Sequence, residues 1–125
     1  MARILLVDDE EPVRGLLKRG LETDGHVVTL AVDGADGLER LTETKGAFDL
    51  LLTDIRMPLM DGIALALAAK RDYPDVTILL MTGFADQRER AKGIEAIVAD
   101  VLTKPFSLTK LRATVERVLT PNAEA

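Results

Sequence analysis

Five short apolar runs that alternate with longer helical segments constrain the fold of this chain more than any other feature of its sequence. The runs are rich in Val, Ile and Leu, and they fall at residues 3–7, 27–31, 49–53, 76–81 and 100–103. Segments with a helical spacing of apolar residues separate them. This alternation is typical of strand, helix and strand units built around a parallel sheet. The sequence therefore predicts an α/β fold with a five-stranded parallel sheet.

Three of these runs, at residues 3–7, 49–53 and 76–81, are almost uniformly apolar. Parallel strands that helices cover on both faces have this composition. We therefore expect these three strands in the centre of the sheet.

The helices are expected at residues 12–25, 35–43, 63–71, 87–94 and 108–119. Pro12 suits a first helical turn, Gly25 can adopt the left-handed conformation that follows a helix, and Ser107 is a typical N-cap. The fourth helix contains Gly93 and has a poor apolar stripe, so its intrinsic stability should be low. The buried stripe of the first helix is expected to consist of Val13, Leu16, Leu17, Gly20 and Leu21.

A chain of 125 residues has room for one hydrophobic core. We expect one domain at residues 1–120 and a frayed tail at residues 121–125, with no separate output domain. The sequence has no secretory signal and no apolar run near the roughly 20 residues that cross a bilayer. A cytoplasmic protein without membrane contact is therefore expected.

Composition excludes several functions. The chain has no cysteine and a single histidine, His26, which excludes disulfides, thiolate nucleophiles, a histidine-based triad and a multi-histidine zinc site. The net charge of -5 is opposite to the charge that binding to a phosphate backbone requires. We therefore expect no direct contact with nucleic acid.

Polar residues follow four of the predicted strands. Asp8 and Asp9 follow the first strand, Asp54 the third, Thr82 the fourth and Lys104 the fifth. Ligand sites of open parallel sheets lie at the carboxyl ends of the strands. The sequence therefore predicts that these side chains share one edge of the sheet.

Three carboxylates gathered at one edge repel one another and call for a cation. Oxygen ligands without sulfur or imidazole favour a hard ion, Mg²⁺ above all. A carboxylate is also a competent nucleophile toward phosphorus, and an ammonium and a hydroxyl can stabilise the phosphoryl oxygens. Asp54, Lys104 and Thr82 offer these three groups.

Each residue also has an ordinary interpretation when it is taken alone. An Asp-Asp pair such as Asp8 and Asp9 often caps a helix, Asp54 could be a turn residue, and Lys104 could be a solvated surface lysine. Thr82 could be a simple strand-end hydroxyl. The functional interpretation rests on the coincidence of these groups at the ends of four different strands.

Four motifs are distributed along essentially the whole chain. They are Ile4-Leu5-Leu6-Val7-Asp8-Asp9-Glu10, Asp54-Ile55-Arg56-Met57-Pro58-Leu59-Met60-Asp61-Gly62, Met81-Thr82-Gly83 and Leu102-Thr103-Lys104-Pro105-Phe106. Together they resemble the receiver domains of bacterial response regulators. The resemblance implies a doubly wound, flavodoxin-like fold with strand order 2-1-3-4-5 and five flanking helices.

The resemblance implies that Asp54 is the phosphoacceptor of a two-component phosphorelay and that Mg²⁺ is its cofactor. Asp9 and Asp54 would be direct ligands of the metal, and Asp8 a ligand through water. The backbone carbonyl of Arg56 would complete the set of protein ligands. The loop that follows should be a tight turn, because a proline fixes one dihedral angle and Gly62 permits an unusual one.

The resemblance also assigns the groups that hold the phosphate. Thr82 would bond a phosphoryl oxygen, and Lys104 would pair first with Asp54 and then with the phosphate. The peptide bond before Pro105 is expected to be cis. Such a domain is a switch and not an enzyme in the ordinary sense, since it catalyses only its own phosphorylation and dephosphorylation.

The expected partners are a sensor histidine kinase or a histidine phosphotransfer protein as donor, and an output protein that senses the phosphorylated form. Segments 53–54, 81–84 and 101–106 resemble alphaproteobacterial regulators that control substrate delivery to a AAA+ protease during the cell cycle. This resemblance makes the proteolysis machinery a candidate output partner.

One position departs from the family pattern. Many receiver domains have an aromatic residue three positions before the lysine, whereas this chain has Val101. A short β-branched side chain cannot swing inward as an aromatic ring does. Phe84 is the candidate substitute, and the expected readout surface is the fourth helix, the fifth strand and the fifth helix.

Three alternatives stay open at this point. A haloacid-dehalogenase enzyme also uses an aspartyl nucleophile, but its motif needs an acid where this chain has Arg56. A receiver-like module that binds partners without phosphorylation usually lacks one of the acids or the lysine, and this chain retains them. A phosphorelay intermediate would have the same site and would pass its phosphate onward.

Overall fold

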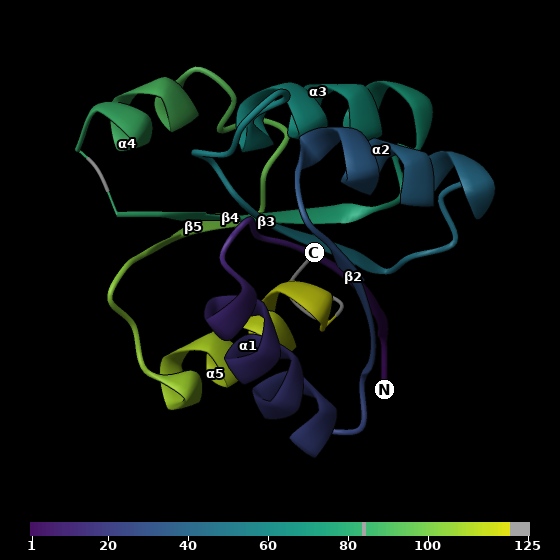
Figure 1. The fold of residues 1–125 in the computed structure, drawn as a ribbon, viewed down its shortest axis with the longest axis vertical. Coiled ribbons are helices and arrows are strands. Elements are labelled where there is room, and N and C mark those ends of the chain that lie inside the picture. The colour runs from purple at the N-terminus through teal and green to yellow at the C-terminus, as the bar shows by residue number, and fades with distance from the viewer. Residues whose placement is uncertain (84, 121–125) are drawn as a thin grey trace.

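The computed structural model describes residues 1–83 and 85–120, with the backbone alone for residues 85–88. Its centre is a parallel sheet in the order β2-β1-β3-β4-β5 (Figure 1), which confirms the predicted doubly wound α/β architecture. The uniformly apolar runs form its three inner strands, as predicted. The strands are β1 (Arg3–Val7), β2 (Val27–Ala31), β3 (Leu50–Asp54), β4 (Thr77–Thr82) and β5 (Asp100–Thr103).

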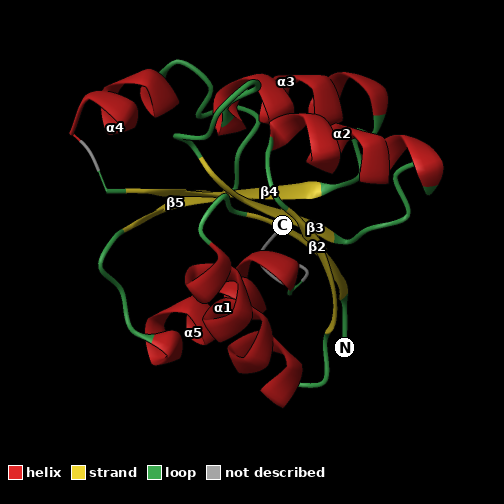
Figure 2. Ribbon diagram, viewed as in Figure 1, coloured by secondary structure: helices red, strands yellow, loops and turns green. Residues whose placement is uncertain are grey.

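Helices cover both faces of this sheet. Figure 2 shows α1 and α5 together on one face and α2, α3 and α4 on the other. In the part of the chain that the structure describes, no helix combines the length and the apolar character that crossing a membrane requires. The helices are α1 (Glu11–Thr23), α2 (Gly34–Glu43), α3 (Gly62–Asp72), α4 (Ala85–Lys92) and α5 (Leu108–Leu119).

The inner strands separate two apolar cores. In β1, Leu5 and Val7 belong to the core under α2 and α3, whereas Ile4 and Leu6 belong to the core under α1 and α5. Successive side chains of a strand point to opposite faces, so a strand buried on both faces is apolar along most of its length. This arrangement explains the uniform apolar runs of the sequence.

The predicted helix boundaries are close to the observed ones, but the stripe of α1 is partly wrong. Leu17 and Leu21 are buried as expected, whereas Leu16 keeps 47 % of its surface exposed. The helix ends at Thr23, and Gly25 follows with a positive φ of 84°. Only part of the apolar surface of α1 therefore faces the sheet.

The ends of the other helices follow local rules. The Ser107 side chain accepts a hydrogen bond from the Lys110 backbone N–H at 3.0 Å, which confirms the predicted cap of α5. Helix α4 lies at residues 85–92 and not at the expected 87–94. The proposed substitute switch Phe84 and the tail at residues 121–125 lie outside the described residues.

Candidate functional site

The candidate site lies at the carboxyl edge of the sheet, where the chain leaves β1, β3, β4 and β5. Asp8 and Asp9 follow β1, and Asp54 and Thr82 are the last residues of β3 and β4. Lys104 follows β5 directly. These strand ends surround a cavity of about 370 Å³, lined by Asp9, Glu10, Asp54, Arg56, Gly83 and Lys104.

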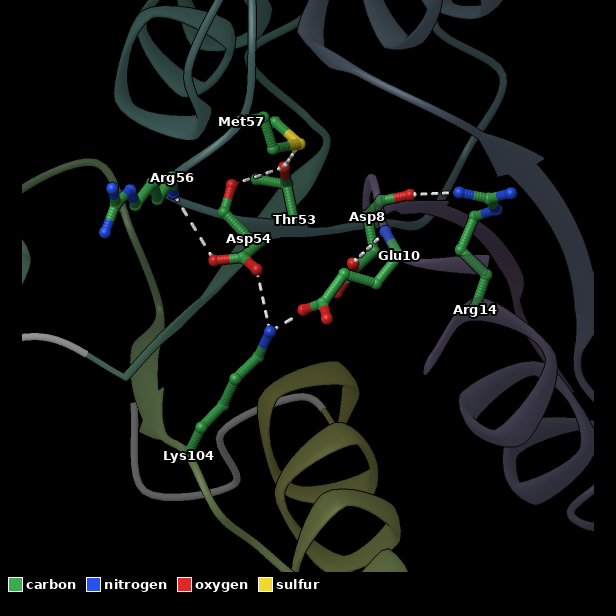
Figure 3. Close-up of polar contacts among 8 residues, drawn as sticks. All are labelled: Asp8, Glu10, Arg14, Thr53, Asp54, Arg56, Met57 and Lys104. Atoms are coloured by element: carbon green, nitrogen blue, oxygen red, sulfur yellow. Dashed lines mark hydrogen bonds and ion pairs between the residues drawn. The ribbon is translucent and has the colours of Figure 1, made fainter. Parts of the chain in front are cut away.

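The ammonium group of Lys104 joins two strands of this edge (Figure 3). Its Nζ lies 2.7 Å from Asp54 Oδ2 and 3.4 Å from Asp8 Oδ2. Burial alone would lower the pKa of Lys104, but its hydrogen bond to Asp54 and the charges of both aspartates raise that pKa above its usual value. Lys104 is therefore positively charged at neutral pH and faces the phosphoacceptor candidate, as predicted.

Asp8 is the most buried acid of the site, with no exposed surface. Burial raises the pKa of its carboxyl group, although a hydrogen bond from the Glu10 backbone and the charge of Lys104 oppose this effect. The Arg14 guanidinium donates a hydrogen bond to the Asp8 backbone carbonyl at 2.7 Å. These contacts hold in place a carboxylate whose ionised form is unfavourable without a cation.

Four carboxylates converge at the cavity. Those of Asp8, Asp9, Glu10 and Asp54 each offer an oxygen atom, and these atoms all lie within 4.8 Å of one another. Hard cations such as Mg²⁺ prefer sets of oxygen donors of this kind. The residues present thus fit the predicted cofactor.

Glu10 is the member of this group that sequence reasoning did not assign. It directly follows the Asp8-Asp9 pair within the first motif, which was the available signal. Glutamate just before a helix is ordinarily interpreted as part of the helix start. Where its side chain points depends on the path of the β1–α1 loop.

Arg56, whose backbone carbonyl is the predicted metal ligand, lines the cavity. Its backbone N–H faces Asp54 Oδ1 at 3.4 Å, which places its peptide unit beside the acceptor carboxylate. The expected role of Gly62 was wrong in one respect, because Leu59 and not Gly62 has a positive φ in this loop, at 68°.

Gly62 is required for a different reason. A β-carbon at this position would overlap the backbone carbonyl oxygen of Asp54 and lie 2.9 Å from Ile55 Cα. The Gly62 N–H also donates a hydrogen bond to the Ile55 carbonyl at 2.8 Å. The loop therefore folds back directly onto the backbone of Asp54.

Thr82 is buried at the end of β4, and its carbonyl accepts a hydrogen bond from the Lys104 backbone N–H at 2.7 Å. This bond holds the ends of β4 and β5 side by side. The Lys104–Pro105 peptide bond is cis, as expected. Val101 is half-buried and packs against the core under α2 and α3.

The chain belongs to the family of response regulator receiver domains, whose family model matches residues 4–116. Among curated proteins it is similar to the response regulator receiver protein CpdR of Brucella abortus. The two are 44 % identical over 119 residues, which cover 95 % of this chain and 98 % of CpdR.

Longer regulators and solved structures show the same likeness. The transcriptional regulatory protein PrrA of Mycobacterium leprae is 38 % identical over 117 residues, which cover 94 % of this chain and 49 % of PrrA. The chain thus spans about half the length of the first curated relatives it matches. A structure of the response regulator TrrA from Thermotoga maritima, in complex with Mg²⁺-BeF, superimposes with a TM-score of 0.83. It is 30 % identical, and the match covers 94 % of this chain and 99 % of TrrA.

Proposed function

We propose that this chain is a phosphoacceptor switch of a two-component system that accepts a phosphoryl group on Asp54. The observation that carries the proposal is the Lys104 Nζ at 2.7 Å from Asp54 Oδ2, within a group of four converging carboxylates. A carboxylate beside an ammonium and a cation site can attack phosphorus while the charge of the transferred group is balanced. The donor is a histidine kinase or a histidine phosphotransfer protein.

In the transfer step an oxygen of the Asp54 carboxylate attacks the phosphorus, and the bond to the donor histidine nitrogen breaks. The electron pair of that bond stays on the imidazole. Lys104 then pairs with a phosphoryl oxygen, and the Thr82 hydroxyl binds another. The chain catalyses only its own phosphorylation and dephosphorylation.

Asp8, Asp9, Asp54 and the backbone carbonyl of Arg56 would hold Mg²⁺ in this proposal. The ion supplies positive charge against the phosphoryl oxygens. The likeness to TrrA, which binds Mg²⁺-BeF, supports this assignment.

Output would occur by contact with another protein through α4, β5 and α5. The likeness to CpdR along nearly its whole length supports a regulator that works as an isolated receiver domain. The proteolysis machinery is the proposed output partner, in the cytoplasm. Val101 offers no aromatic switch at this surface, so another group must report phosphorylation.

Intact-mass measurement tests the acceptor. Incubation with a small phosphodonor and Mg²⁺ should add one phosphoryl group, and Asp54→Asn should remove it, because an amide is no nucleophile toward phosphorus. Asp75→Asn is the matched control, since Asp75 is exposed on the loop between α3 and β4. An undiminished label in Asp54→Asn, or a lost label in Asp75→Asn, would contradict the assignment.

Mg²⁺ affinity should depend on pH because the cation binds ionised ligands. The raised pKa of Asp8 means that protons compete with Mg²⁺ at a higher pH than the ordinary value of 3.8 predicts. Below that raised pKa, one competing proton weakens apparent affinity by about tenfold per pH unit. Calorimetric titration with Mg²⁺ measures this, with circular dichroism to confirm folding. Constant affinity down to pH 3.8 would exclude Asp8 from the site.

A further inference from the structure

Glu10 stands at the N-cap position of α1, but its side chain makes no capping hydrogen bond. N-cap side chains usually accept a hydrogen bond from the first turn of their helix. The Glu10 carboxylate instead reaches into the acidic group, within 4.8 Å of oxygens of Asp8, Asp9 and Asp54. Figure 3 shows it extended from the β1–α1 loop toward Lys104 and Asp54. A helix-capping role therefore does not explain its position.

Two of the other three acids in this group have partners. Asp8 and Asp54 both pair with Lys104, and backbone N–H groups face both carboxylates. Among the side chains that the structure describes, those of residues 1–83 and 89–120, the Glu10 carboxylate has no hydrogen bond or ion pair. Glu10 is exposed and lines the cavity. The negative charge of Glu10 therefore faces any ion or phosphoryl group that binds in the cavity.

We propose that Glu10 sets the charge balance of this site, favouring the cation before phosphorylation and shortening the lifetime of the phosphoryl group afterwards. The proposal rests on the proposed phosphorylation of Asp54. A fourth carboxylate within 4.8 Å adds attraction for a divalent cation. Once Asp54 is phosphorylated, the same charge faces a phosphoryl dianion and repels it.

Hydrolysis relieves this repulsion. Water attacks the phosphorus, the bond between phosphorus and the Asp54 oxygen breaks, and its electron pair returns to the Asp54 carboxylate. Inorganic phosphate leaves with the oxygen and both protons of the water, as H2PO4−. In a loose transition state, negative charge moves from the phosphoryl oxygens onto the leaving carboxylate. Before phosphorylation Lys104 Nζ lies 2.7 Å from that carboxylate, so the lysine can return to it as the bond to phosphorus breaks. Glu10 therefore destabilises the phosphorylated state more than the transition state, and hydrolysis becomes faster.

The test is a charge series at position 10 with a neighbouring control. Glu10→Gln removes the charge and keeps the shape, and Glu10→Lys reverses the charge. Glu11→Gln makes the same charge change one residue further on, outside the acidic group. The measurements are the Mg²⁺ dissociation constant of the unphosphorylated domain and the rate of loss of label from the phosphorylated domain.

For Glu10→Gln we expect Mg²⁺ binding weakened by about three- to tenfold and a phosphoryl lifetime lengthened by a similar factor. Glu10→Lys should shift both quantities further, and Glu11→Gln should change neither. Unchanged Mg²⁺ affinity and lifetime in Glu10→Gln, or equal changes in Glu11→Gln, would overturn the proposal. If the wild-type chain takes no label, the proposed function fails, and the Mg²⁺ titrations alone still decide whether Glu10 acts on the cation.

Discussion

Gly62→Ala is expected to destabilise the domain by roughly 3 kcal/mol and to impair phosphorylation of Asp54. The added β-carbon would overlap the Asp54 carbonyl oxygen. The backbone fixes the positions of both atoms, so neither can rotate away as the end of a long side chain can. Relief of the overlap must move the end of β3 or the start of α3. Either movement displaces the acceptor carboxylate from Lys104.

Urea unfolding followed by circular dichroism measures the stability, and intact mass measures phosphorylation under conditions where the variant remains folded. Gly15→Ala is the matched control, because its nearest atom beyond the neighbouring backbone is the flexible end of Arg19 at 3.8 Å. Within a helix this change should stabilise the domain by about 0.5–1 kcal/mol. A Gly62→Ala variant that unfolds at the wild-type urea concentration would show that the loop does not depend on this close approach.

The sheet could be predicted from the sequence because strands that are buried on both faces consist mainly of apolar residues. The inner strands are almost uniformly apolar between their first residue and their carboxyl end, so their positions were predicted to within one residue. The amphipathic surface of α1 was less informative. Gly20 lies against Leu108 of α5, and this close approach directs the contact face of α1 away from Leu16.

The residues of the candidate site were likewise predicted only in part. Residues such as Lys104 could be placed because strand ends of a parallel sheet share one edge. The direction of the Glu10 side chain and the left-handed conformation of Leu59 could not, since both depend on the paths of loops that connect distant parts of the chain. A leucine gives no signal for a positive φ, because this conformation is unfavourable for it and persists only where the surrounding structure imposes it.

Asp8→Asn is expected to stabilise the metal-free domain and to abolish most of its response to Mg²⁺. The wild-type carboxylate is fully buried among like charges, and burial is the largest cause of its raised pKa. Asparagine can still accept the hydrogen bond from the Glu10 backbone, and Lys104 keeps Asp54 as its partner at 2.7 Å. A gain of about 1 kcal/mol, or roughly 3–6 °C in melting temperature, is reasonable for a domain of this size.

The stability difference between Asp8→Asn and the wild type should depend on pH. A carboxyl group with a raised pKa binds its proton more tightly in the folded state, so wild-type stability falls as pH rises from 3.8 through the raised pKa. The advantage of Asp8→Asn should therefore be absent below pH 3.8 and should grow above it.

Mg²⁺ should make the wild type more stable than Asp8→Asn. A hundredfold excess of Mg²⁺ over the dissociation constant stabilises the wild type by about 2.7 kcal/mol and the variant far less. Melting curves with and without Mg²⁺, with Asp75→Asn as control, measure both effects. An equal Mg²⁺ response in Asp8→Asn and wild type would remove Asp8 from the cation site.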